Sequence, residues 1–140
     1  MDIKLVETEK EQQHAYQVRT LVFVEEQGVP KEEEIDNLEQ EAIHFVGYCN
    51  NMPVAASRMR FAGQFAKLER VCVLKEKRGM GFGRDLILVM ENLAKAKGYK
   101  QSKLNGQTYA ESFYQRLGYK TVSNEFMDAG IPHVAMEKTL

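Results

Sequence analysis

The first apolar positions along the chain predict a strand followed by a helix. Residues 2–7 alternate apolar and polar side chains, as a short strand does. Thr8 precedes Glu11 by three residues, which is the spacing of a helix-starting capping box. The apolar face of this helix would carry Ala15, Val18, Leu21 and Val22. Gly28 and Pro30 then end the element.

In the middle of the chain the apolar period changes to two, which predicts strands. Residues 42–49 and 54–61 flank Asn50–Asn51, and asparagine tolerates the positive φ that a tight hairpin turn requires. We therefore expect a β-hairpin here. Gly63 allows a second turn, which leads into a strand over residues 65–74.

The strongest helical pattern of the chain begins at Phe82 and ends before Gly98. Its apolar residues recur at steps of three and four: Phe82, Leu86, Val89, Met90, Leu93 and Ala94. Gly98 suits the position after a helix, where a left-handed residue is common. The remaining predicted elements are a strand at 99–105, a short helix at 109–117, and two strands at 119–122 and 133–137, with a loop between them.

This order of elements predicts a mixed α/β fold in one domain over residues 1–140. A helix connects strand 65–74 to strand 99–105, so these two strands should be parallel. The hairpins make the rest of the sheet antiparallel. The expected fold class is therefore a mostly antiparallel mixed sheet flanked by helices.

Composition and charge exclude several classes of protein. The chain has 19 Lys and Arg against 20 Asp and Glu, a net charge of −1, which argues against a nucleic-acid-coating protein. Cys49, Cys72 and the histidines at 14, 44 and 133 lack metal-ligand spacing, so we expect no metal site. No export signal or long apolar run is present, so we expect a cytoplasmic protein with no membrane partner.

A basic, glycine-rich turn, KEKRGMGFGR at residues 75–84, precedes the long helix. Its cations are Lys75, Lys77, Arg78 and Arg84 against the single acid Glu76, a local charge of +3. No Ser, Thr, Asp or Asn can cap the helix before Asp85. The unpaired amides of a helix start bind anions, so the turn is a candidate phosphate or pyrophosphate site.

Two phosphate-binding motifs fail at this turn, and a simpler reading stays open. The dinucleotide fingerprint needs a third glycine where Arg84 stands, and the phosphate loop of nucleotide hydrolases needs a Lys and a Ser or Thr there. The simpler reading is a tight strand-to-helix turn whose basic side chains are solvated.

The turn does resemble a signature of one known family. Arg78-x-x-Gly81-x-Gly83 is similar to the [QR]-x-x-G-x-[GA] acyl-CoA signature of the GCN5-related N-acetyltransferase (GNAT) family. It follows a strand of the form L-x-R-V-x-V at residues 68–73 and precedes the long helix, as the signature does in that family.

A second segment, residues 107–119, resembles the family's N-x-x-A-x-x-[FL]-Y-x-x-x-G-[FY] motif. The matching residues are Ala110, Phe113, Tyr114, Gly118 and Tyr119. Gln107 departs from the pattern, because it stands where the common residue is Asn. This departure and the stretch RTLVFVEEQGVP at residues 19–30 resemble the ElaA-like branch of the family.

The resemblance implies transfer of an acetyl group from acetyl-CoA to a primary amine, without a metal. The residues it places against the coenzyme are Val71, Cys72, Val73, Arg78, Gly79, Met80, Gly81, Phe82, Gly83, Arg84 and Gln107. A non-catalytic CoA-binding sensor of the same fold is the alternative function. Dimers are frequent in the family, which leaves a homodimer open.

The resemblance also implies candidate proton donors and acceptors. Tyr114 is the candidate general acid for the departing CoA thiolate, because a phenol is protonated at neutral pH. Its alternative role is a core aromatic beside Phe113. Glu69 is the candidate base, and its alternative is the polar face of a strand. His133 is a second candidate base, and the sequence does not decide between the two.

Acidic residues concentrate at positions 25–41, with eight Asp and Glu against Lys31, a local charge of −7. The family places its N-terminal helices beside the acceptor, so this segment could attract a cationic amine. The alternative is a solvated helix face.

Overall fold

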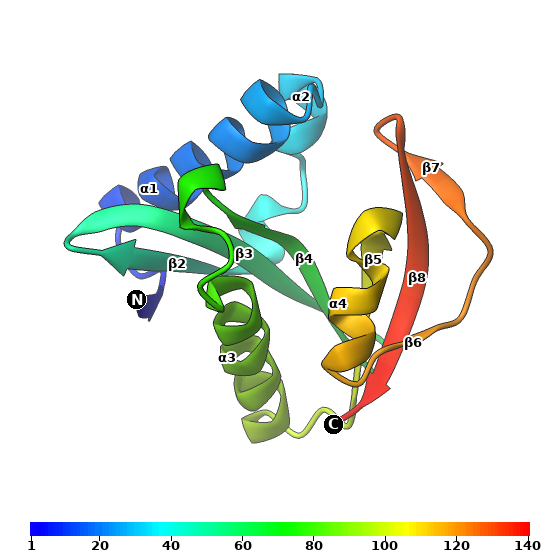
Figure 1. Ribbon diagram of the computed structural model, residues 1–140. Coiled ribbons are helices and arrows are strands. Elements are labelled where there is room, and N and C mark those ends of the chain that lie inside the picture. Colours follow the sequence, from blue (N-terminus) through cyan, green and yellow to red (C-terminus); the bar gives the residue numbers. More distant parts are fainter.

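The computed structural model describes residues 1–140 and contains one eight-stranded sheet in the order β1-β2-β3-β4-β5-β8-β6, with β7 paired to β8 (Figure 1). The strands are β1 (Asp2–Leu5), β2 (Ile43–Cys49), β3 (Met52–Ala62), β4 (Phe65–Val73), β5 (Gln101–Gln107), β6 (Lys120–Thr121), β7 (Phe126–Asp128) and β8 (Ile131–Thr139). Only β4 and β5 are parallel, and every other pair is antiparallel. The predicted mixed, mostly antiparallel sheet is confirmed.

Helices cover both faces of this sheet. They are α1 (Glu9–Arg19), which continues as a π-helical segment (Thr20–Glu26), α2 (Lys31–Glu34), α3 (Phe82–Ala96) and α4 (Glu111–Arg116), with short 3-10 turns at Glu39–Glu41, Lys75–Lys77 and Thr108–Ala110. The neighbouring residues Ala55 and Ala56 of β3 point to opposite faces. Ala55 packs in a cluster with α3, whereas Ala56 packs with Ala15 and Val18 of α1.

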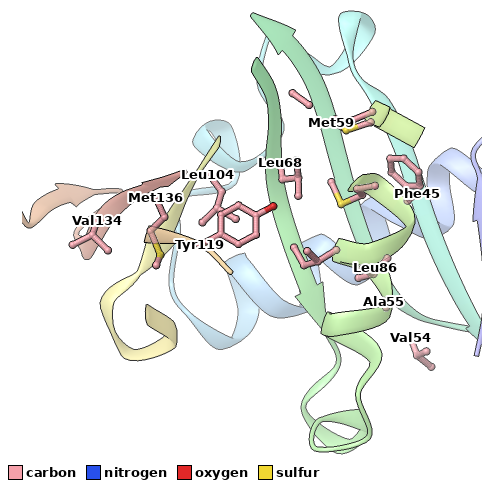
Figure 2. Close-up of a cluster of buried hydrophobic side chains, with 14 residues drawn as sticks. Phe45, Val54, Ala55, Met59, Leu68, Leu86, Leu104, Tyr119, Val134 and Met136 are labelled. Atoms are coloured by element: carbon pink, nitrogen blue, oxygen red, sulfur yellow. The ribbon is translucent and has the colours of Figure 1, made fainter. Parts of the chain in front are cut away.

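The larger core lies between α3 and the sheet (Figure 2). Leu86, Ile87 and Met90 supply the buried stripe of α3, and all three are fully buried. Residues from five strands belong to the same cluster: Phe45, Met59, Leu68, Leu104, Val134 and Met136. Because α3 packs on β3 and β4, its N-terminus is held at the end of β4, where the candidate phosphate site lies.

Several local predictions are confirmed. Thr8 and Glu11 form the reciprocal hydrogen bonds of a capping box at the start of α1. Asn50 and Asn51 have φ of 50° and 65° in the β2–β3 turn, as a tight hairpin requires. Gly98 follows α3 with a φ of 91°.

Two predictions about the chain's irregular segments were wrong. Leu21 was expected on the apolar face of the first helix, but its side chain is 43% exposed while Val22 is buried. The π-helical turn adds a residue per turn and shifts the register of the face after Arg19. The expected loop before the last strand contains β7, which pairs with β8 across a turn at Ala129 and Gly130.

The parallel strands β4 and β5 are paired at one end only and separate along the rest of their length. Their pairing covers only Phe65–Leu68 with Gln101–Leu104. Beyond it, β4 has a bulge where Arg70 and Val71 lie opposite Ser57 of β3, and Arg70 adopts a φ of 57°. A bulge bends its strand. The upper ends of β4 and β5 diverge in Figure 1.

Candidate functional site

A cavity of about 450 Å³ lies between the separated ends of β4 and β5. It is lined by most residues that the sequence singled out: Glu69, Val71, Cys72, Val73, Arg78, Gly79, Gly81, Phe82, Gly83, Arg84, Gln107, Tyr114 and His133. Met80 is the exception, because it is absent from the lining and 59% exposed. Residues far apart in sequence therefore meet in one cleft.

One wall of the cleft is the free edge of β4. The N–H of Leu74 donates to the carbonyl of Val54 on β3, at 2.9 Å. Because backbone groups alternate along a strand, those of Val73 and Val71 point the other way, into the cleft. The carbonyl of Val73 accepts from Nε of Arg78 at 3.0 Å, and the other groups of this edge are open to an extended ligand with amide groups.

The glycine turn at the start of α3 forms the mouth of the cleft. Gly79 and Gly81 have φ of 82° and 83°, and a Cβ at either position would meet no atom within 4 Å. Gly81 is the N-cap residue of the 15-residue helix α3, and no side chain caps it. The first amides of α3 therefore face open space, and Arg84 adds positive charge to the same wall.

Arg78 is not a free cation, because its guanidinium group is paired with a carboxylate. Its Nη1 and Nη2 donate to the two carboxylate oxygens of Glu26, both at 2.6 Å. This contact ties the glycine turn to the π-helical segment before α2. It also neutralises part of the local charge of +3 that the sequence indicated, so the amides of α3 together with Lys77 and Arg84, which both line the cavity, remain as candidate anion-binding groups.

Tyr114 of α4 forms the opposite wall. A Cβ on Gly106 would lie 3.0 Å from the Tyr114 ring, so the ring packs directly on the backbone of β5. The Tyr114 hydroxyl makes no hydrogen bond within the protein, and the side chain lines the cavity. Burial raises the pKa of Tyr114 well above its usual range. The phenol therefore stays protonated at neutral pH and can donate to a group in the cleft.

Gln107 lies on the other face of β5 from Tyr114. Leu104 and Gly106 face α3 and α4, so the side chain of Gln107 points the opposite way. Its Nε2 donates to Oε1 of Gln27 at 2.9 Å, which links β5 to the segment between α1 and α2. Sequence reasoning missed Gln27, although it lies in the stretch that resembles the ElaA-like branch.

A second cavity of about 390 Å³ adjoins the cleft on this face. The residues that line both cavities are Phe23, Glu69, Arg70, Gln107, Asp128 and His133. Asp128 was not predicted, because the sequence placed it in a loop without chemistry. The shared residues mark the junction at which a group bound in the cleft would meet a molecule bound in the second cavity.

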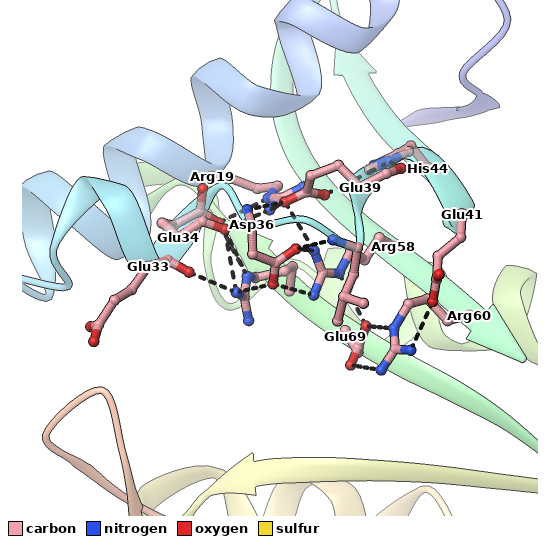
Figure 3. Close-up of polar contacts among 12 residues, drawn as sticks. Arg19, Glu33, Glu34, Asp36, Glu39, Glu41, His44, Arg58, Arg60 and Glu69 are labelled. Atoms are coloured by element: carbon pink, nitrogen blue, oxygen red, sulfur yellow. Dashed lines mark hydrogen bonds and ion pairs between the residues drawn. The ribbon is translucent and has the colours of Figure 1, made fainter. Parts of the chain in front are cut away.

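Most of the acidic segment at residues 25–41 is not an open negative field, because five of its eight acids are paired with arginines (Figure 3). Only Glu25, Glu32 and Glu33 are exposed and unpaired, as the solvated helix face predicted. Arg19 and Arg58 are fully buried, and the first donates to Glu34 at 2.9 Å while the second donates to Asp36 at 2.8 Å. Glu34 is only 1% exposed. The network joins four arginines, Arg19, Arg58, Arg60 and Arg70, to five acids, Glu34, Asp36, Glu39, Glu41 and Glu69. Most of the apparent local charge of −7 is therefore neutralised.

Glu69 belongs to this network. Its Oε1 accepts from Nε of Arg58 at 3.0 Å and Nε of Arg60 at 2.8 Å, and its Oε2 accepts from Nη2 of Arg60 at 3.0 Å. Burial alone would raise the pKa of Glu69, but the hydrogen bonds and charges of the two arginines outweigh burial and lower it. A carboxylate held in this way is a weak base.

The network predicts that the protein loses stability in acid. Burial opposes ionisation of Asp36, but hydrogen bonds from Arg58 and the backbone of Leu38 lower its pKa to about 2. A carboxyl whose pKa is depressed on folding stabilises the protein above its unfolded pKa of about 4, and this stabilisation disappears as the pH falls toward 2. We expect the free energy of unfolding from urea titrations to decrease through this window.

Asp36→Asn is the matched variant for this prediction. It removes the titrating group, so its free energy of unfolding should be lower near neutral pH and should depend less on pH in the acid window. A variant with the same acid dependence as the unaltered protein would contradict the assignment to Asp36.

Comparison with known proteins agrees with this geometry. A family model described as the acetyltransferase (GNAT) domain matches residues 6–140. The chain belongs to the GNAT family. It is 45% identical to the uncharacterized N-acetyltransferase YjcF of Bacillus subtilis over 139 residues, 99% of each chain. As a GNAT protein with acetyltransferase relatives, the chain is an acetyltransferase.

Solved structures share the fold. Escherichia coli ElaA is 24% identical, with a TM-score of 0.85 over 98% of each chain. A GNAT family acetyltransferase of Elizabethkingia anophelis, solved with acetyl-CoA bound, is 16% identical, with a TM-score of 0.79 over 99% of this chain and 97% of that one. At these identities the likeness concerns the fold. The GNAT protein described here contains no helix that is both long and apolar enough to cross a membrane.

Proposed function

We propose that the protein transfers an acetyl group from acetyl-CoA directly to a primary amine. One observation supports this most strongly: the uncapped start of α3, the free edge of β4 and the side chain of Tyr114 all line the same cavity. An anion site, a strand-pairing edge and a buried proton donor are the three features that a pyrophosphate, a pantetheine arm and a thiol leaving group require.

The residues present fit the parts of the donor substrate. The amides of residues 79–83 and the side chain of Arg84 would hold the pyrophosphate. The backbone groups of Val71 and Val73 would pair with the pantetheine amides, as an added strand does. The acetyl-CoA bound by the GNAT protein of E. anophelis supports the same donor for this fold.

The reaction then needs two proton movements. The amine nitrogen forms a bond to the carbonyl carbon of the thioester, and the carbon–sulfur bond breaks. The leaving thiolate takes the phenolic proton of Tyr114, and the amine loses a proton to a base on the acceptor side. The products are an N-acetyl amide and free CoA, and solvent returns the proton to Tyr114.

Two further proposals concern the domain organisation and the cellular location of the protein. We propose that residues 1–140 act as a single catalytic domain, because both core clusters pack on one sheet. We propose a cytoplasmic location, because Cys49 and Cys72 are free thiols, which is typical of proteins in a reducing compartment.

Thermal-shift measurements test the donor site. CoA and acetyl-CoA should raise the melting temperature, whereas ATP and NADH should change it little, because only a ligand of the native state stabilises it. Gly81→Val should weaken CoA binding at least ~10-fold, because the new side chain would occupy the space before the first amides of α3.

Gly63→Val is the matched control for this variant. Gly63 also has a positive φ, 58°, with open space around it, but lies in the β3–β4 turn outside the cleft. Both variants should lose stability through backbone strain, and only Gly81→Val should lose the shift caused by CoA. Equal CoA binding in the two variants would contradict the proposed anion site.

Release of free thiol from acetyl-CoA separates an enzyme from a CoA-binding sensor. The proposed function predicts release that depends on an added amine from a panel of polyamines, amino acids and peptides. Stabilisation by CoA without amine-dependent release would favour the sensor.

A further inference from the structure

His133 lies at the junction of the two cavities of the site. In the β5–β8 register, His133 lies directly opposite Gln107, and residues in such a pair share a face of the sheet. This is the acceptor face, because Gly106 and Tyr114 occupy the other one. His133 is also one of the six residues that line both cavities, and its side chain is 9% exposed.

Hydrogen bonding determines which nitrogen of His133 is available. Its Nδ1 lies 2.6 Å from the carbonyl oxygen of Ile131. A carbonyl oxygen only accepts, so Nδ1 must carry the hydrogen. In the neutral ring the lone pair is therefore on Nε2, and Nε2 makes no hydrogen bond within the protein. The ring is also stacked on Phe126, with centroids 6.1 Å apart and an interplanar angle of 23°, which restricts its orientation.

The other ionisable groups of the junction are less suited to accept a proton. Both oxygens of Glu69 accept from guanidinium groups. Arg70 donates to the backbone of α2 and to Asp36. Asp128, on β7 beside His133, is the remaining acid at the junction.

We propose that His133 is the general base of the acetyl transfer and that Glu69 is a positioning residue, which orients Arg58 and Arg60 behind the acceptor cavity. This inference rests on the proposed function. Nε2 of His133 accepts one proton from the attacking amine while the nitrogen–carbon bond forms. Tyr114 gives a proton to the thiolate on the opposite face, so one proton enters and one leaves the reacting groups. The imidazolium then returns its proton to solvent.

The pH dependence of turnover tests the role of His133. His133→Gln should lower kcat/KM about 100-fold, within the usual range for loss of a general base, and should leave CoA binding unchanged. The unaltered enzyme should show the acidic limb of kcat/KM that an essential general base produces, and this acidic limb should be absent from the variant. His133→Ala should regain activity when imidazole is added, which a merely structural role would not produce.

His14→Gln is the matched control, because His14 lies on α1, bonds to Tyr48 and lines neither cavity. It should keep the activity and pH profile of the unaltered enzyme. An unchanged profile in His133→Gln, or loss of the acidic limb in Glu69→Gln instead, would overturn the inference while the proposed function stands. Absence of amine-dependent turnover in the unaltered enzyme would overturn both.

Discussion

Tyr114→Phe should lower kcat by about 100-fold or more while CoA binds as before. The variant removes only the phenolic oxygen, and the ring that packs on Gly106 is kept. Because the Tyr114 hydroxyl makes no hydrogen bond within the protein, its loss should cost little stability. Steady-state kinetics with acetyl-CoA and a reactive amine, together with a CoA titration, measure both effects.

Tyr109→Phe is the control for this variant. Tyr109 also lines the cleft, but its side chain is 76% exposed at the rim. Removal of its hydroxyl should change kcat less than about 3-fold, since a solvated phenol at the rim has no role in proton transfer. If Tyr114→Phe turned over at the normal rate, the assigned general acid would be wrong.

Arg19→Met should lower the free energy of unfolding by about 3–5 kcal/mol, the usual cost of removing one partner from a buried ion pair. Arg19 is fully buried and donates to Glu34 at 2.9 Å and to Glu39 at 2.6 Å. Methionine fills the space but leaves both carboxylates without their main partner. Urea denaturation of the two proteins at neutral pH measures the difference.

Arg116→Met on α4 is the control for the loss of stability expected in Arg19→Met. Arg116 is exposed and forms no ion pair, so its replacement should change the free energy of unfolding by less than about 0.5 kcal/mol. A loss below about 1 kcal/mol in Arg19→Met would show that the neighbouring arginines compensate for it and that the network does not depend on Arg19.

Local signals in the sequence predicted the regular elements well. The capping box at Thr8, the asparagine turn at residues 50–51 and the apolar stripe of α3 each depend on residues a few positions apart. The π-helical turn after Arg19 could not be predicted in this way, because no local residue pattern requires it. The turn goes together with the packing of Val22 in the core, which depends on residues far away in the sequence.

The sequence singled out more residues on one side of the candidate site than on the other. The proposed donor side comes from one stretch of the chain, residues 69–84, and from the motif around Tyr114, so the resemblance singled out most of the residues that line this part of the cavity. The proposed acceptor side is assembled from distant residues: the bond from Gln107 to Gln27 spans 80 positions. Apolar periodicity also gives no reason to bury an arginine such as Arg19, whose position depends on acids that follow it by 15 and 20 residues.

The central claim is that this cleft moves an acetyl group from acetyl-CoA to an amine nitrogen. The decisive measurement uses acetyl-CoA with an isotopically labelled acetyl group, the protein of residues 1–140 and a panel of primary amines, with products identified by mass spectrometry. We expect the label in an N-acetyl amide of at least one amine, with an equal amount of free CoA, and little product from Tyr114→Phe. Tight CoA binding with no labelled amide from any amine would contradict the claim.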